Sequence, residues 1–229
     1  MEPAQGEPAF GACAGILPSD DGATPSSSCG NLKGFVPVGF TRLGCGRGIS
    51  QAHVSKETGF MVLNSVVENT FNQQINAELY ASYLYLSMSA WLEHADLPGF
   101  ARFMRGQSQE EYEHAMRFLE HIEDRDGFVR LLPIEAPPTE FDSVEDVIAQ
   151  ALAHEAHVSV LINDIYRITV ENEDHAAQVM LHWFITEQVE EEKLFRDILA
   201  ELRKVDGQSD ALLLLDRDMG NRTDTDAGT

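Results

Sequence analysis

Cysteine is scarce in this chain and confined to its first part. Of the 229 residues only Cys13, Cys29 and Cys45 are cysteines, and no two of them form a C-x-x-C pair. The sequence therefore lacks the thiolate set of a zinc ribbon, a rubredoxin-like iron site or a thioredoxin-type redox centre. The cysteine-free body must fold without disulfides, which is compatible with a reducing compartment.

Basic residues and long apolar runs are scarce as well. The chain has 16 Lys and Arg residues against 38 Asp and Glu residues, which gives a formal net charge of −22. This excess of negative charge repels nucleic acid and anionic membrane surfaces, and it attracts cations. No apolar run approaches the roughly 18 residues of a membrane-spanning helix. We therefore expect a soluble protein without a nucleic-acid or membrane partner.

Helical periodicity is missing from residues 1–60, which hold 11 of the 17 glycines. Clusters such as SDDGATPSSSCG and RLGCGRGIS are typical of loops or disorder. We interpret residues 1–60 as a disordered Gly/Ser-rich extension, either a targeting segment or an artefact of the translation start, with Met61 as the true start. A targeting segment would predict a plastid or a mitochondrion, whereas an artefact predicts a cytoplasmic protein.

Apolar residues recur at helical spacing from about residue 64 onward. The pattern predicts long helices over about 64–94, 98–126, 144–172 and 174–206, and a short helix within SDALLLLDRDMG. Pro98 suits a first helical turn, and Ser143 suits an N-cap. Residues 127–141 contain three prolines and no helical stripe, so they predict an extended crossover.

This order predicts an all-α fold over residues 61–222. It is a four-helix bundle with a long crossover between the second and third helices and a short fifth helix at the C-terminal end. We expect residues 223–229 to form a disordered tail.

Polar side chains interrupt the apolar stripe of every long helix. They are Glu78, Glu111, His114, Glu155, Gln188 and Glu191. Helical spacing puts each of them on the same face as the neighbouring apolar residues. Burying so many charged groups together is unfavourable unless cations neutralise them. The set therefore predicts a metal site inside the bundle.

The types of ligand indicate which metal would bind. Carboxylate oxygens with a single imidazole are typical of iron or manganese and differ from thiolate-rich zinc and copper sites. Glu111 and His114 form an E-x-x-H step, which lets both side chains reach one metal, and Glu111 is placed to bridge to a second. We therefore expect a dinuclear site. The other histidines are interpreted as ordinary surface or packing residues: His53, His94, His121, His154, His157, His175 and His182.

Four longer motifs carry a family resemblance: NAELYASYLYLSMSAW, QSQEEYEHAMRF, HWFITEQVEEEKLF and ALLLLDRDMG. Over residues 61–223 the sequence resembles the non-haem ferritins of the bacterial type, which belong to the ferritin-like di-iron proteins. The resemblance implies iron storage with ferroxidase activity. Such a protein oxidises Fe(II) with dioxygen or hydrogen peroxide and deposits ferric mineral inside a homo-oligomeric shell of roughly 24 subunits.

The resemblance also implies roles for individual residues. The first iron site would be Glu78, Glu111 and His114. The second would be Glu111, Glu155 and Glu191, with Gln188 beside it. A third iron site would be Glu110, Glu187 and Glu190. Tyr85 matches a tyrosine next to the site that donates an electron during oxygen reduction.

Two departures argue against haem. A haem-binding bacterioferritin would be expected to have a second E-x-x-H on the fourth helix, where this chain has Gln188 and Glu191, and its haem-ligating methionine would fall at Tyr112. We therefore expect iron and no haem. Two alternatives stay open: a di-iron oxidase that removes peroxide and stores little iron, and a structural cage subunit with a degenerate site.

Overall fold

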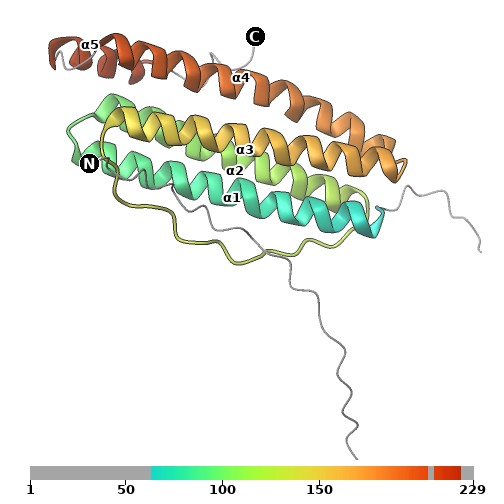
Figure 1. Cartoon of the computed structure of the whole chain (residues 1–229). Helices are drawn as coiled ribbons and strands as arrows, with labels where there is room; N and C mark the ends of the chain where they lie inside the picture. The colour runs from blue at the N-terminus through green and yellow to red at the C-terminus, as the bar shows by residue number, and fades with distance from the viewer. Residues whose placement is uncertain (1–62, 206–208, 223–229) are drawn as a thin grey trace, which may run out of the picture. The chain divides into compact units, whose positions relative to one another are not determined.

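The computed structural model describes residues 63–205 and 209–222, and all the regular secondary structure in this part of the chain is α-helical. Its helices are α1 (Ser65–His94), α2 (Pro98–Asp124), α3 (Val144–Glu171), α4 (His175–Val205) and α5 (Ser209–Met219). The predicted all-α fold with a short fifth helix is confirmed (Figure 1). The predictions for residues 1–60 and for the tail 223–229 lie outside the described residues.

Local signals in the sequence set where these helices begin. The Asn64 side chain accepts a hydrogen bond from the Val66 N–H, and the Ser143 side chain accepts one from the Asp146 N–H, so both act as N-caps. Pro98 is the first residue of α2, where its missing N–H costs no helical hydrogen bond. The predicted roles of Pro98 and Ser143 are thus confirmed.

Two residues after the end of each of three helices, the backbone adopts the left-handed conformation. The residues that adopt it are Asp96, Asp126 and Glu173, with φ angles of 59°, 56° and 53°. The N–H after each of them reaches back across the last turn, as Gly127 N–H does to Ile122 O at 2.9 Å. Gly127, near which the sequence predicts the end of the second helix, therefore follows the left-handed residue and does not itself adopt that conformation.

The long crossover determines how the two helical hairpins are arranged. The extended segment 127–141 runs along the bundle before α3 begins, so α3 runs parallel to α2 (Figure 1). Its first residues are held on α1: Arg130 pairs with Glu68 at 2.6 Å, and the Asn72 amide donates to Phe128 O at 3.0 Å. Antiparallel hairpins α1–α2 and α3–α4 then enclose one interior.

Two apolar cores fill the interior at either end, with a polar layer between them. One core includes Tyr85, Met104 and Phe195, and the other includes Phe71, Phe118 and Phe184. The six inward polar residues fall between these cores along each helix, as predicted from the stripes. Close packing of the apolar ends holds the side chains of this layer in place.

Helix α5 is attached to the start of α2 by a buried carboxylate. Asp216 is 3% exposed, and its Oδ1 atom accepts hydrogen bonds from the Gly99 and Phe100 N–H groups, each at 2.9 Å. These are the unpaired donors at the N-terminus of α2, where negative charge is favoured. A Cβ atom on Gly99 would lie 1.6 Å from Asp216 O, so only glycine permits this close approach. None of the described helices is both long and apolar enough to cross a membrane.

Candidate metal centre

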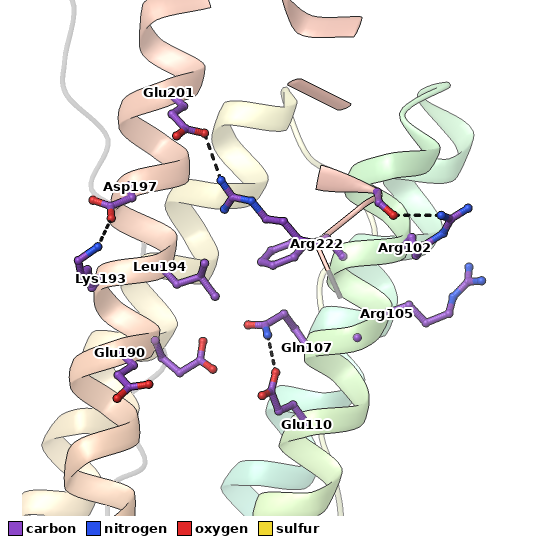
Figure 2. A pocket seen from close by; sticks show the side chains of 14 residues that line it. Arg102, Arg105, Gln107, Glu110, Glu190, Lys193, Leu194, Asp197, Glu201 and Arg222 are labelled. Carbon is purple, nitrogen blue, oxygen red and sulfur yellow. Dashed lines mark hydrogen bonds and ion pairs between the residues drawn. The ribbon is translucent and has the colours of Figure 1, made fainter. Parts of the chain in front are cut away.

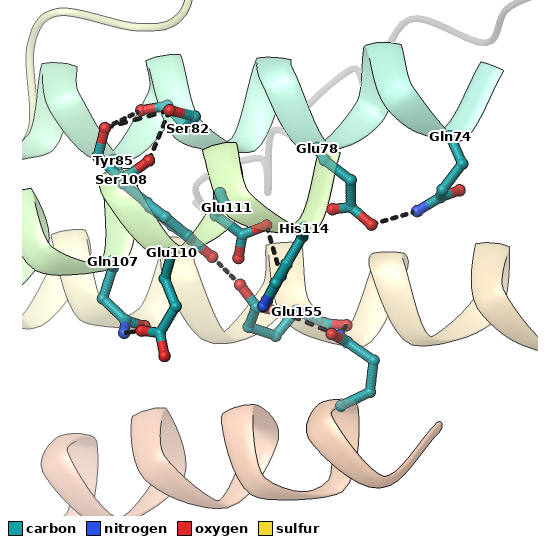
Figure 3. A network of polar contacts seen from close by, with 11 residues as sticks. Gln74, Glu78, Ser82, Tyr85, Gln107, Ser108, Glu110, Glu111, His114 and Glu155 are labelled. Atoms are coloured by element: carbon teal, nitrogen blue, oxygen red, sulfur yellow. Dashed lines mark hydrogen bonds and ion pairs between the residues drawn. The ribbon is translucent and has the colours of Figure 1, made fainter. Parts of the chain in front are cut away.

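All six inward polar residues predicted from the stripes are buried. The exposed fractions are 1% for Glu78, 3% for Glu111, 3% for His114, 0% for Glu155, 5% for Gln188 and 3% for Glu191. They come from all four long helices and lie in the layer between the two apolar cores. Figure 3 labels Glu78, Glu111, His114 and Glu155 among them. The bundle therefore gathers side chains that are widely separated in the sequence.

One cluster with metal-binding potential is formed by Glu78, Glu111 and His114. One potential ligand atom from each residue lies within 4.8 Å of the other two. The His114 Nδ1 atom is 3.4 Å from Glu111 Oε2 across one helical turn, so both side chains face the same point. The Gln74 amide donates a hydrogen bond of 2.9 Å to Glu78 Oε1 and so fixes that carboxylate. The other oxygen, Oε2, has no hydrogen-bond partner among the described residues.

Glu155 is held in place from two sides. The Tyr85 hydroxyl donates a hydrogen bond to its Oε1 atom, and the Gln188 amide donates one of 3.0 Å to its Oε2 atom. The same amide also donates to the Glu155 main-chain oxygen at 3.2 Å. The glutamine and tyrosine thus orient a carboxylate next to the first cluster, which is what neighbours of metal ligands typically do.

A second cluster lies toward α4 and consists of Glu110, Glu187 and Glu191, whose ligand atoms also fall within 4.8 Å of one another. Gln107 donates a 2.7 Å hydrogen bond to Glu110. The predicted third site named Glu190 as a member, but Glu190 is exposed and falls outside this cluster. The site of Glu110, Glu187 and Glu190 thus stays a prediction, and Glu191 belongs both to the buried layer and to this outer cluster.

The electrostatics of the layer are unfavourable without a cation. Burial and neighbouring carboxylates raise the pKa of Glu78, Glu111 and Glu191 well above the usual value. Burial also raises the pKa of Glu155, although the Tyr85 and Gln188 hydrogen bonds oppose this shift. Within the described residues, one oxygen each of Glu78, Glu111 and Glu191 is buried with no hydrogen-bond partner. Clustered anionic oxygens without donors are suited to bind a hard cation.

Several residues around the centre were not identified from the sequence. Trp183 packs edge-on against the His114 ring at 5.3 Å, and Arg117 lies 3.8 Å over the Trp183 ring. His154, interpreted from the sequence as an ordinary histidine, contacts the rings of both Tyr80 and Tyr85 at 5.9 Å. Burial lowers the pKa of His154 to about 4, so this imidazole is neutral near pH 7. These contacts depend on tertiary packing and leave no periodic signal.

The fold and the site together define a ferritin-like four-helix bundle with a carboxylate-rich candidate metal centre. Residues 68–205 match the family described as the ferritin-like domain. A probable bacterial non-heme ferritin-like protein of Haemophilus influenzae is 35% identical over 160 residues, which cover 70% of this chain and 97% of the relative. A bacterial non-heme ferritin of Bacteroides fragilis is 34% identical over 161 residues, covering 70% of this chain and all of the relative.

Solved structures give the same result. An open-pore ferritin from the hyperthermophilic archaeon Archaeoglobus fulgidus is 37% identical and superposes with a TM-score of 0.70, covering 70% of this chain and 99% of its own. The chain belongs to the ferritin family and, within it, resembles the non-haem ferritins of the bacterial type.

Proposed function

We propose that this chain is an iron-storage ferritin with ferroxidase activity. The observation that carries the proposal is the buried layer of four carboxylates and one imidazole, in which three carboxylate oxygens lack hydrogen-bond partners among the described residues. Glu78, Glu111 and His114 would bind one Fe(II), and Glu111, Glu155 and Glu191 would bind a second. The substrates are then Fe(II) and an oxidant, dioxygen or hydrogen peroxide.

The carboxylates favour the oxidation of bound Fe(II). Hard anionic oxygens stabilise Fe(III) more than Fe(II), so a carboxylate-rich site makes iron easier to oxidise. Two Fe(II) ions lose one electron each, and one dioxygen molecule takes up both electrons and two protons to become hydrogen peroxide. Glu155, fixed by Tyr85 and Gln188, keeps its orientation during this change of charge. We propose Tyr85, which donates a hydrogen bond to Glu155, as an electron donor during oxygen reduction.

The outer cluster supports a role in moving iron away from the oxidation site. Glu191 belongs both to the buried layer and to the cluster with Glu110 and Glu187. We propose that an ion moves between the two by way of the Glu191 carboxylate. We propose this cluster as the third iron site, with Glu190 on its exposed side.

Storage requires assembly, and the surface of the chain supports it. Large apolar side chains are exposed on α1 and on the crossover that covers it: Tyr83, Leu86, Phe128, Leu131, Leu132 and Ile134. Leu213 and Leu214 are exposed on α5. Large apolar side chains exposed in such number are typical of surfaces that other protein chains cover. We propose that copies of this chain assemble into a hollow shell of roughly 24 subunits.

Aerobic loading with Fe(II), followed by size separation and an iron count for each particle, tests this function. We expect a large particle that carries many more irons than its binding sites could hold. About two irons per chain on a small oligomer would indicate a di-iron redox enzyme instead, and a large particle that takes up no iron would indicate a structural cage.

A further inference from the structure

A hollow of about 720 Å³ lies between α2 and α4, beside the buried ligand layer. Glu110 and Glu190 lie toward one end, with Gln107 and Leu194 further along (Figure 2). Glu191 also lines the hollow, although it is only 3% exposed, and its Oε2 atom has no hydrogen-bond partner within the described residues. One residue of the candidate metal centre, with a buried and unpaired carboxylate oxygen, therefore lines the hollow.

Arg222 crosses the other end of this hollow. It follows α5, on the side of α2, and its Nη2 atom lies 3.4 Å from Glu201 Oε2 on α4 (Figure 2). The backbone that leads to Arg222 is held in place, because Arg102 donates a 3.0 Å hydrogen bond to Gly220 O and Asp216 holds α5 on α2. The guanidinium can therefore leave Glu201 without α5 moving.

Only carboxylates are charged at the end of the hollow near the candidate metal centre, whereas the rest of the lining carries both signs: Arg102, Arg105, Lys193 and Arg222 with Asp197 and Glu201. Carboxylates near the centre attract cations, while the Arg222 guanidinium at the outer end repels them. Both members of the Arg222–Glu201 pair are partly exposed, with side-chain exposures of 32% and 43%. Such pairs contribute little to stability, so this one opens easily. A divalent cation that arrives at the hollow also competes with Arg222 for the Glu201 carboxylate.

We propose that this hollow is an entry vestibule for hydrated divalent cations and that the Arg222–Glu201 pair is its gate. Arg222 closes the vestibule while it pairs with Glu201, and it opens the vestibule when a cation takes its place on the carboxylate. The identification of the physiological cation as Fe(II) rests on the proposed function, whereas the proposal of the gate does not depend on it.

The gate is tested on iron-free protein by measuring how fast a reporter inside the hollow reacts. Leu194→Cys, in a chain whose Cys13, Cys29 and Cys45 are replaced by serine, is labelled with a cationic thiol reagent. Arg222→Gln is expected to speed this labelling about threefold, the scale of one exposed ion pair. Arg203→Gln is the control, because Arg203 forms a surface ion pair with Glu145 at 2.9 Å, between α4 and α3 and away from the residues that line the hollow. Equal labelling rates in all three chains would overturn the gate.

The vestibule is tested by cation entry. Trp183 contacts His114, so Co(II) that reaches the centre should quench its fluorescence, and stopped-flow mixing gives the rate. Arg222→Gln is expected to speed quenching about threefold. The exchange Glu201→Arg with Arg222→Glu should restore the slower rate.

Unchanged quenching with faster labelling would overturn the vestibule. Neither experiment requires iron oxidation. A chain that fails to oxidise Fe(II) would therefore refute the proposed function without altering these two results.

Discussion

Replacing Glu111 with glutamine should slow the rapid phase of aerobic Fe(II) oxidation by at least about 100-fold, since even the neighbours of metal ligands contribute 10- to 100-fold. Glu111 is the residue that both proposed iron sites share, and it lies 3.4 Å from the His114 ring. Glutamine keeps the shape of the side chain and removes its charge, so the helices should stay folded. Stopped-flow absorbance after mixing with Fe(II) measures the rate.

The matched control for this variant is Glu120→Gln. Glu120 lies on the same helix but is exposed, so it tests the loss of one charge from α2 without touching the buried layer. Its oxidation rate should equal that of the unmodified chain. Thermal unfolding adds an independent readout: Glu111→Gln should be at least as stable as the iron-free parent, because an unneutralised buried carboxylate is a cost to folding. A Glu111→Gln chain that oxidises Fe(II) at the parent rate would refute the assignment.

Raising the pH should destabilise the iron-free protein. The pKa values of Glu78, Glu111 and Glu191 are raised by burial and by one another, so the folded state holds protons that the unfolded chain releases above about pH 4.5. Stability is then lost as the pH rises through the raised pKa values. His154 acts in the opposite direction, because its pKa is lowered from 6.5 to about 4 and its contribution grows between these values. Above pH 6.5 the carboxylates therefore dominate.

Thermal unfolding midpoints between pH 6.5 and 8.5 measure this dependence. The midpoint of the iron-free protein should fall across this range, and Glu111→Gln should make the fall shallower while Glu120→Gln leaves it unchanged. Fe(II) added without oxygen should reverse the fall, since a ligand at 100 times its Kd adds about 2.7 kcal/mol of stability. A midpoint that is flat with pH and indifferent to Fe(II) would mean that the buried carboxylates need no cation.

The bundle and its inward polar residues were predictable because both follow local rules. Ser143 and Pro98 begin their helices for reasons that reside in one or two residues. The inward position of Glu78, Glu155 and Glu191 follows from the helical period, which relates each of them to apolar residues on the same face. Periodicity alone was enough to place these side chains in the buried layer.

Features that depend on contacts between helices could not be predicted. Glu190 and Glu191 are adjacent in the sequence and differ by about 100° around the helix, and only the packed rotation of α4 decides which one joins Glu110 and Glu187. The burial of His154 depends on Tyr80 and Tyr85 from α1. Likewise, the Arg222–Glu201 pair joins residues from α4 and the segment after α5 that share no local pattern.

Anomalous diffraction at the iron edge, from crystals soaked in Fe(II) without oxygen, tests the central claim most directly. Two iron peaks per chain are predicted within the buried layer. One should lie among Glu78, Glu111 and His114, and the other among Glu111, Glu155 and Glu191. Peaks confined to exposed carboxylates, with none between the two apolar cores, would contradict the account.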